Sequence, residues 1–480
     1  MNSSLPPGAA DEQLEKGALS TTDIVFFVLA GVAPMGVVVA VLSLSVALGN
    51  GPGVPGTYLI AGVVLALFAA GYVQMSRRIT NTGGFYTYAR EGLGKAAGGA
   101  AACLALVTYN AGTIGIFGSL AYFSDVVAGQ FGLHLGWATW AVVALAAVAA
   151  LSYFEVTLSA KALAVLLAAE VLVLLAFDVA VLVHNGFHGF SLSVFRPSVV
   201  FGGGFGISLM LAFGSFAGFE ATALYGEEAK NPRRSVPRAT YLALAAITIF
   251  YLLTMWAAIS SYGFSNAKAA AQADPQNFMF KAMASMLSQG MADVMAVLVV
   301  TSLFAAFLAF HCNTARYQFA LARAGLLPHW LTRTHPRYGS PVAASALQLL
   351  LVAVVTAAFG LAGKDPYLGM GVSLFGFGVL GIVVLQAIAA ASIVGFFLRR
   401  REGEPVLLAI VAPVLGGLGL VVGLVYMISN YSILAAGTVK QLDYLPWLLP
   451  IAAVLGAVAA VKRHRNESVR RDQNDAIAGA

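Results

Sequence analysis

The chain has 480 residues, of which 59% are hydrophobic and only 10% are charged, with a formal net charge of +6. Soluble domains carry about 25% charged residues, so this chain cannot cover a water-facing surface in the usual way. Intrinsic disorder needs low hydrophobicity and is excluded by the same figures. The composition therefore predicts a polytopic membrane protein and argues against a soluble enzyme or a nucleic-acid-binding protein.

Twelve predominantly apolar stretches follow one another along the chain. A bilayer core of about 30 Å needs about 20 such residues in a helix. By this measure the expected spans are residues 23–48, 57–76, 96–128, 137–154, 160–183, 205–226, 238–261, 291–320, 342–361, 370–398, 405–428 and 445–461. They predict an all-α protein with 12 transmembrane helices in a membrane domain at 21–462, between polar tails at 1–20 and 463–480.

The positions of Lys and Arg test this count. If the N-terminus is cytoplasmic, 22 of the 27 basic residues lie on the inner side, and the outer five are Arg196, Lys268, Lys281, Lys364 and Lys440. This asymmetry follows the positive-inside rule and predicts that both termini lie in the cytoplasm. The net positive charge is then explained by topology and by attraction to anionic lipid, without nucleic acid as a partner.

The first span is interrupted at Gly31-Val32-Ala33-Pro34-Met35-Gly36. Pro34 removes one amide donor, and the flanking glycines allow the backbone to unwind. Proline is favoured at the first position of a helix, so a half-helix is expected to begin there and to leave the next three amides bare. Those amides and the helix dipole would attract a small anion such as a carboxylate.

The sixth span is interrupted at Phe213-Gly214-Ser215-Phe216-Ala217-Gly218-Phe219-Glu220. Its freed carbonyl groups could accept hydrogen bonds from an ammonium group. Unpaired backbone is tolerated in a membrane only where it lines a cavity or is buried in protein. Together the two interruptions predict a site for an α-amino acid, although each alone could be an ordinary Gly/Pro kink.

The two interruptions lie five spans apart, so the second block of five must enter the membrane in the opposite orientation. This predicts an inverted repeat with the binding site between its halves, as in many secondary transporters. The first repeat covers about residues 23–183 and the second about residues 205–398. Two extra helices, at about 405–461, fall outside it.

Four stretches carry a family resemblance over nearly the whole chain. They are the first interruption, Gly83-Gly84-Phe85-Tyr86-Thr87-Tyr88 after span 2, the sixth interruption with Gly226–Ala239 behind it, and Arg316–Pro328 with His335-Pro336-Arg337 and Ser340-Pro341. With them the chain resembles the amino acid–polyamine–organocation (APC) superfamily of permeases. The resemblance implies a leucine-transporter-type, five-plus-five bundle that moves amino acids across the cytoplasmic membrane by alternating access, with a proton or a second substrate as the coupled species.

The chain departs from the family at two informative points. Many members have Gly-Ser-Gly at the first interruption, where this chain has Val32-Ala33-Pro34-Met35-Gly36, so carboxylate recognition is expected to be rearranged and polyamine or small-amine substrates stay open. Proton-coupled members often carry a lysine in span 5 at the position of Glu170. Coupling chemistry therefore cannot simply be transferred.

Charged groups within a span are costly, so each needs a reason. Glu220 is a candidate for substrate or proton binding, because it follows the unwound stretch, and Glu170 in mid-span 5 is a candidate for coupling. Either could instead be structural. The candidate substrate-binding residues are Val32, Ala33, Met35, Gly36, Tyr109, Phe213, Ser215, Phe216, Ala217, Gly218, Phe219 and Glu220.

Other classes of function have weaker support in the sequence. An ion channel is a remote alternative, since channels use symmetric pore rings and not one pair of broken helices. No metal-ligand spacing, nucleophile elbow or phosphate-binding loop is found, so neither an enzyme nor a metal or other cofactor is predicted. Cys103 and Cys312 lie in apolar stretches and are interpreted as packing residues.

Overall fold

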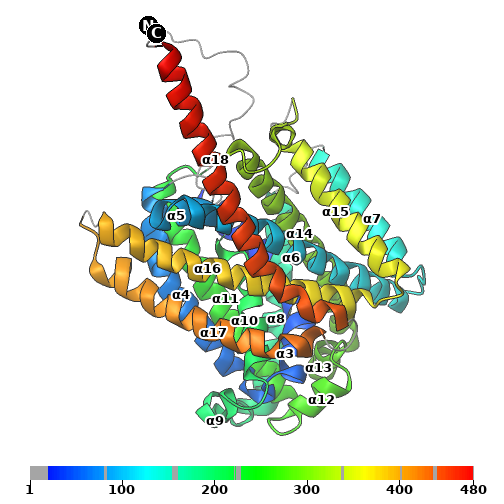
Figure 1. The fold of residues 1–480 in the computed structure, drawn as a ribbon. Helices are drawn as coiled ribbons and strands as arrows, with labels where there is room; N and C mark the ends of the chain where they lie inside the picture. The colour runs from blue at the N-terminus through cyan, green and yellow to red at the C-terminus, as the bar shows by residue number, and fades with distance from the viewer. Residues whose placement is uncertain are drawn as a thin grey trace.

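The computed structural model describes residues 20–79, 84–153, 160–220, 222, 229–336, 340–400, 403–435 and 440–478. These residues form helices and no β-strand (Figure 1). The prediction of an all-α protein is confirmed. Residues 1–19 of the N-terminal tail lie outside the described residues, as do Gly83, Gly226–Glu228 and Arg337 of the stretches named above.

A helix lies at the position of each expected span. Within the described ranges, nine apolar helices are long enough to cross a membrane, and three apolar helices are shorter. The longer spans are built on α4 (Val54–Arg78), α6 (Lys95–Gln130), α8 (Ala160–Gly189), α11 (Pro232–Tyr262), α14 (Gln289–Arg323), α15 (Val342–Leu361), η7 (Pro366–Val372) with α16 (Ser373–Arg399), η8 (Leu407–Val411) with α17 (Ala412–Ala435), and η9 (Lys440–Trp447) with α18 (Leu448–Ala478). The shorter ones are α7 (Trp137–Tyr153), α10 (Phe205–Ser215) and Pro34–Leu48, which joins α2 (Pro34–Gly36), η2 (Val37–Leu42) and α3 (Ser43–Leu48).

Short helices fill the connections at the two ends of the molecule. One end carries α5 (Gly84–Leu93) and the C-terminal part of α18, and the opposite end carries α9 (Pro197–Val200), α12 (Ala267–Ala273) and α13 (Phe278–Met286) (Figure 1). The remaining short elements are η3 (Gly51–Gly53), η4 (Leu192–Phe195) and η6 (His329–Thr332). The sequence did not predict helix in the linkers at 77–95 and 264–289.

The boundary at residues 461–463, expected to separate the last span from a tail, is not a helix end. Helix α18 continues to Ala478. Its extension contains four arginines, which are good helix formers and need no apolar partner. A fall in hydropathy predicts where a helix leaves the lipid and does not predict where the helix ends. Here the helix continues beyond that point.

Some spans form the centre of the bundle and others its periphery. In the most apolar window of each span, 72% of the residues are buried in α6, against 22% in α15 and 17% in the span that ends at Arg463. Helices α7 and α15 lie side by side as a pair at the edge of the molecule (Figure 1). The central helices are therefore the ones placed to form a site.

The central helices α6 and α16 approach each other through glycines. A Cβ atom added to Gly115 of α6 would overlap the backbone nitrogen of Phe375, and one added to Gly378 of α16 would lie 2.7 Å from the backbone nitrogen of Gly112. Small residues allow such close contact between membrane helices, where packing replaces the hydrophobic effect as the attractive force. This crossing fixes one wall of the cavity described below.

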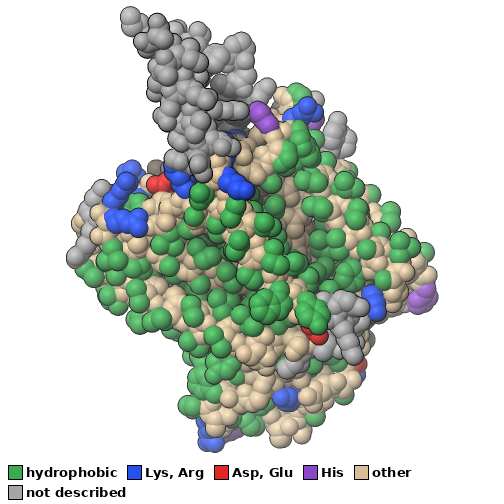
Figure 2. Space-filling model, viewed as in Figure 1, with side chains coloured by type: hydrophobic (Ala, Val, Ile, Leu, Met, Phe, Trp, Pro, Cys, Tyr) green, Lys and Arg blue, Asp and Glu red, His purple; other side chains and the backbone are tan. Residues whose placement is uncertain are grey.

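The surface agrees with a membrane setting. A broad band of hydrophobic side chains crosses the middle of the molecule, and Lys and Arg gather mainly at the end from which α18 projects (Figure 2). Many large apolar residues on the outer helices are exposed, among them Val183, Leu361 and Val425. Lipid would cover this surface in the membrane.

Candidate functional site

The first span is interrupted where the sequence predicts it. Helix α1 (Thr21–Val32) ends before Ala33, whose φ of 52° and ψ of 71° are left-handed, and α2 begins at Pro34. Ala33 is the one non-glycine residue with positive φ in the described ranges. This conformation costs an L-residue about 1–2 kcal/mol. Because proline has no amide hydrogen and a fixed φ, it starts the second half-helix without losing a hydrogen bond.

The amides of this half-helix are occupied, so the expectation that they lie bare is wrong in this structure. The Met35 amide donates to Glu170 Oε2 (3.1 Å), and the Gly36 amide donates to Ser302 Oγ (3.2 Å). The Val37 amide donates to the carbonyl oxygen of Ala33 (2.8 Å). Ser302 Oγ also donates to Glu170 Oε2 (2.7 Å). A carboxylate of α8 thus takes the place that the amides and the helix dipole provide for an anion.

The sixth span is also interrupted where predicted. Helix α10 ends at Ser215, and Gly218 has a φ of 111°, which favours glycine. The carboxylate of Glu220 turns back into this interruption. Its Oε2 accepts from the Gly218 amide (3.0 Å), and its Oε1 accepts from Tyr109 Oη (3.2 Å).

Glu220 also joins the interruption to a neighbouring helix through its backbone. Tyr72 Oη of α4 donates to the Glu220 carbonyl oxygen (2.7 Å), and the Tyr72 ring lies 5.2 Å from that of Tyr88 in α5. The unwound stretch is therefore held by hydrogen bonds on the side that faces α5. These groups are buried, so each broken bond would leave a costly unpaired group.

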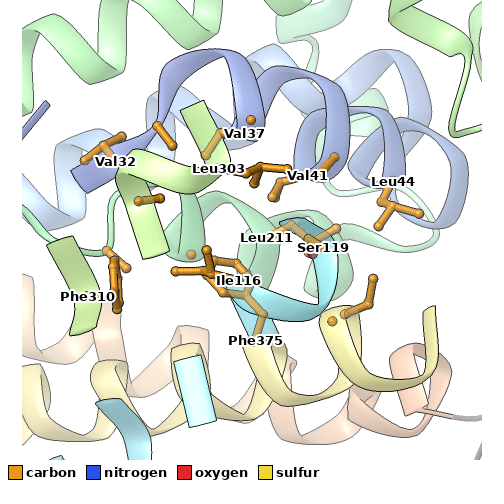
Figure 3. Close-up of a pocket in the computed structure, with 18 of the residues that line it drawn as sticks. Val32, Val37, Val41, Leu44, Ile116, Ser119, Leu211, Leu303, Phe310 and Phe375 are labelled. Carbon is orange, nitrogen blue, oxygen red and sulfur yellow. The ribbon is translucent and has the colours of Figure 1, made fainter. Parts of the chain in front are cut away.

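A cavity of about 50 Å³ lies beside the two interruptions (Figure 3). Its walls come from the first span, from α6, from α10, from α14 and from η7 with α16. The lining residues are Gly31, Val32, Ala33, Gly36, Val37, Ala40, Val41, Leu44, Ile116, Ser119, Leu211, Gly214, Ala217, Leu303, Ala306, Phe310, Tyr367, Gly371, Val372 and Phe375. Apolar side chains point into the space from all sides (Figure 3). A single water needs roughly 10–15 Å³, so the cavity holds only a small group.

The few polar side chains on the cavity wall already have partners. Tyr367 Oη donates to the Ala40 carbonyl oxygen (2.7 Å), and Ser119 Oγ donates to the Gly115 carbonyl oxygen (3.3 Å). The Tyr367 ring stacks on Tyr122, whose hydroxyl donates to Gln276 between α12 and α13. The cavity is thus bounded by hydrogen-bonded tyrosines toward the α12 end.

The structure places the sequence-predicted residues in three groups, two of which lie at the cavity. Val32, Ala33, Gly36 and Ala217 line the cavity. A second group binds the two buried carboxylates beside the cavity: the Met35 amide donates to Glu170, and Tyr109 Oη and the Gly218 amide donate to Glu220.

The remaining predicted residues turn toward α4 and α17 and do not line this cavity. Ser215 Oγ shares a hydrogen bond with Tyr58 Oη (2.7 Å). The ring of Phe216 also faces Tyr58, and the ring of Phe219 lies edge-on to Phe68. Phe213 packs against Gly423 of α17.

Several lining residues were not predicted from the sequence, notably Ile116, Leu303, Phe310 and Phe375. They are single apolar side chains on uninterrupted helices, and nothing local distinguishes them from lipid-facing ones. Tyr367 could have been predicted, because Pro366, Gly369 and Gly371 around it indicate an irregular backbone. The structure forms a π-helix there. Irregular helical turns of this kind are frequent at functional sites.

The architecture and the cavity together define a class of protein. Many helices cross the molecule, two of them are interrupted, and a small apolar cavity lies beside the interruptions. This combination is typical of membrane transporters that bind a small molecule between helices. In the described ranges, no group of three His, Cys, Asp or Glu side chains is placed to hold a metal.

Comparison with known proteins gives the family. A sequence model described as "Amino acid permease" matches residues 23–399. The chain belongs to the amino acid permease family of the APC superfamily, and it is accordingly a multi-pass membrane transporter and not an enzyme.

The relatives differ in the substrates that their names state. The branched-chain amino acid permease BcaP of Bacillus subtilis (strain 168) is 25% identical over 434 residues, which are 87% of this chain and 88% of the relative. The methylthioribose transporter of the same organism is 25% identical over 71% of this chain and 74% of its own length. The low-affinity putrescine importer PlaP of Escherichia coli (strain K12) is 25% identical over 73% of this chain and 75% of its own length.

Proposed function

We propose that this chain is a secondary transporter that moves amino acids with aliphatic side chains across the cytoplasmic membrane by alternating access. The observation that carries the proposal is the apolar cavity beside two interrupted helices. Its aliphatic and aromatic lining suits a branched side chain of about four carbon atoms better than a polar one. The name of the permease BcaP points to the same substrate class.

We further propose the arrangement in the membrane that the sequence predicts. Twelve spans form two inverted repeats, about 23–183 and 205–398, with two extra helices at about 405–461. Both termini lie in the cytoplasm. The asymmetric distribution of Lys and Arg supports the orientation, and the matching interruptions in spans 1 and 6 support the repeat.

Glu170 connects substrate binding to proton binding in this proposal. The amides of Met35 and Gly36 form the anion site of the first span, and the Glu170–Ser302 pair occupies it. An incoming substrate carboxylate must displace Glu170 before it can accept those hydrogen bonds. A displaced carboxylate in an apolar region is very costly, so Glu170 takes up a proton from the outer solution as it leaves. One proton then enters with each substrate.

A small amine is the second candidate, and the occupied amides favour it, because an amine needs no carboxylate site. The relative PlaP is named as a putrescine importer. Two charged ends would need acceptors, however, and no carboxylate lines the cavity within the described ranges. An aliphatic amino acid satisfies the cavity wall better.

Filling the cavity tests the substrate site. Ala306→Leu should weaken uptake of leucine, isoleucine and valine by about fivefold or more, because overpacking costs roughly 1–3 kcal/mol. Ala305→Leu is the control, since Ala305 is its neighbour on α14 and does not line the cavity. Uptake by purified protein in proteoliposomes, with putrescine as a competitor, measures both. Unchanged leucine affinity in Ala306→Leu would place the site elsewhere, and stronger inhibition by putrescine than by leucine would favour the amine.

A conservative change at Glu170 tests the coupling. Glu170→Gln keeps an acceptor for the Met35 amide but cannot gain or lose a proton. An acidic outer solution should stimulate leucine uptake by the parent protein and have no such effect on the variant. Asp178→Asn is the control, because Asp178 is another carboxylate of α8 and accepts from Thr254 instead (3.1 Å). Equal stimulation of the parent and the Glu170 variant would return Glu170 to a structural role.

A further inference from the structure

A second cavity, remote from the apolar one, lies at the end of the molecule that carries α5. Its volume is about 240 Å³, and its walls come from α5, the start of α6, the segment after α14, and α18. The lining residues are Tyr86, Arg90, Lys95, Ala324, Leu326, Ala460 and Arg463. Three cations from three different helices thus surround one space, which we call the basic pocket.

Two of the cations are held in place by neighbouring groups. Arg90 Nη1 donates to Tyr86 Oη (3.3 Å), and its guanidinium group lies 5.5 Å from the centre of that ring. Arg463 Nη1 donates to the Ala324 carbonyl oxygen at the end of α14 (2.6 Å). Preorganised guanidinium groups are effective binders of phosphate, because their planar donors match its oxygens.

The charge in the basic pocket is only partly compensated. Glu91 forms an ion pair with Arg90 (3.1 Å), and both side chains are more than a third exposed. Exposed pairs of this kind are weak, so they do not prevent Arg90 from binding a second anion. Lys95 forms no hydrogen bond or ion pair with the residues that the structure describes. The pocket is therefore electropositive and fits an anionic group.

An apolar surface adjoins the basic pocket. On α18, Val454, Leu455, Val458 and Val461 are between 45% and 63% exposed, and they lie within the three turns before Arg463. Lys and Arg side chains border the hydrophobic band at this end of the molecule (Figure 2). A free phosphate ion would use only the pocket, whereas a phospholipid would use the pocket and this surface together.

We propose that the basic pocket binds the phosphate headgroup of an anionic phospholipid, whose acyl chains lie along the exposed face of α18. The lipid would bridge α18, α5 and α6 at this end, and so would reinforce the packing of α18 on the central bundle. Helix α18 already contacts α6 through its backbone near the pocket, where a Cβ at Gly99 of α6 would overlap the Gly456 carbonyl oxygen of α18. Basic pockets between membrane helices on the inner side are known to bind anionic headgroups.

Lipid binding by purified protein tests the proposal. The probes are phosphatidylglycerol, phosphatidylcholine and inorganic phosphate, and retention of lipid is measured by native mass spectrometry in detergent. Arg90→Gln with Lys95→Gln should weaken phosphatidylglycerol binding by about fivefold for each charge removed, since a basic residue near the surface contributes about 1 kcal/mol. Arg463 is left unchanged because it also binds the end of α14.

Arg399→Gln with Arg400→Gln is the matched control, since these two arginines lie outside the pocket at the end of α16. It should leave the phosphatidylglycerol affinity unchanged. Equal retention of phosphatidylglycerol and phosphatidylcholine by the parent protein would overturn the proposal. So would displacement of the lipid by millimolar phosphate, or an equal loss of affinity in both double variants. None of these outcomes depends on the transported substrate.

Discussion

At the scale of single residues, two backbone conformations define the interruptions. Ala33 and Gly218 both have positive φ, one in each broken helix. The cost at Ala33 is offset by hydrogen bonds of the half-helix, because its amides donate to Glu170 and Ser302. At Gly218 the sequence supplies glycine and avoids most of the cost.

Gly218→Ala should destabilise the protein by about 1–2 kcal/mol and lower transport. The reason is conformational, since an added Cβ would lie 3.9 Å from Val32 Cγ2, an ordinary contact. The control is Gly203→Ala, where φ is not positive and nothing lies within 4 Å. Thermal unfolding in detergent measures the difference. Equal stability of the two variants would show that Gly218 is not strained by a side chain.

Glu220 accepts hydrogen bonds from the Gly218 amide and Tyr109 Oη, which are buried near it. Glu220→Gln keeps one carbonyl oxygen, so the Gly218 amide and Tyr109 Oη can no longer both bind an acceptor of full strength. The variant should lose about 1–3 kcal/mol of stability and most of its uptake. Tyr109→Phe removes only one bond and should cost less.

The double variant completes the test of this pair. If the bond between Tyr109 and Glu220 is important, adding Tyr109→Phe to Glu220→Gln should cost much less than it does alone. Thermal unfolding of the two single variants and the double variant gives the coupling energy. Strictly additive costs would mean that the two side chains act independently.

At the scale of elements, the glycine contact between α6 and α16 fixes the wall that carries Ile116 and Phe375. The two helices touch through backbone atoms at Gly115 and Gly378. Any added carbon must push the helices apart, because backbone cannot move out of the way as a flexible side chain can.

Gly115→Ala should therefore destabilise the protein by about 1–3 kcal/mol or more and alter the cavity. Gly112→Ala is a close control, one turn earlier on the same helix, where the new Cβ would lie 3.7 Å from Phe310 Cε1. Both changes raise helix propensity alike, so only the contact differs. Unfolding temperatures of the two variants should separate clearly, and equal values would contradict the close helix contact.

The elements also show how far sequence reasoning reaches. Spans and interruptions were predicted, because hydropathy, proline and glycine act locally. The occupation of the Met35 amide was not, since Glu170 lies 135 residues away and only the packing of α8 against α2 brings them together. Most of the cavity wall was missed for the same reason. Phe310 and Phe375 become lining residues through the relative rotation of whole helices.

At the scale of the whole molecule, charge separates the two ends. Basic residues gather mainly at the end with α5 and α18, and the apolar band lies between the ends (Figure 2). In the orientation proposed from the positive-inside rule, the basic end faces the cytoplasm.

Cysteine labelling checks this orientation. In a background with Cys103→Ala and Cys312→Ala, a membrane-impermeant maleimide added to intact cells should label Lys281→Cys but not Arg399→Cys. Lys281 lies in α13, at the end of the molecule that also carries α12. Arg399 lies at the end of α16, at the basic end. Permeabilised cells should label both variants, which shows that each cysteine is reactive. The reverse pattern in intact cells would invert the proposed topology.

The hydrogen bonds on the two sides of the apolar cavity share no residue. Toward α12 they join Tyr367 to Ala40 and Tyr122 to Gln276, and toward α5 they join Tyr72, Tyr109 and Gly218 to Glu220. In the proposed alternating access, one of these two sets of hydrogen bonds would break while the other stays formed. A carrier that worked in this way would release its cargo to one compartment without ever forming a continuous pore, and the ion gradients across the membrane would be preserved.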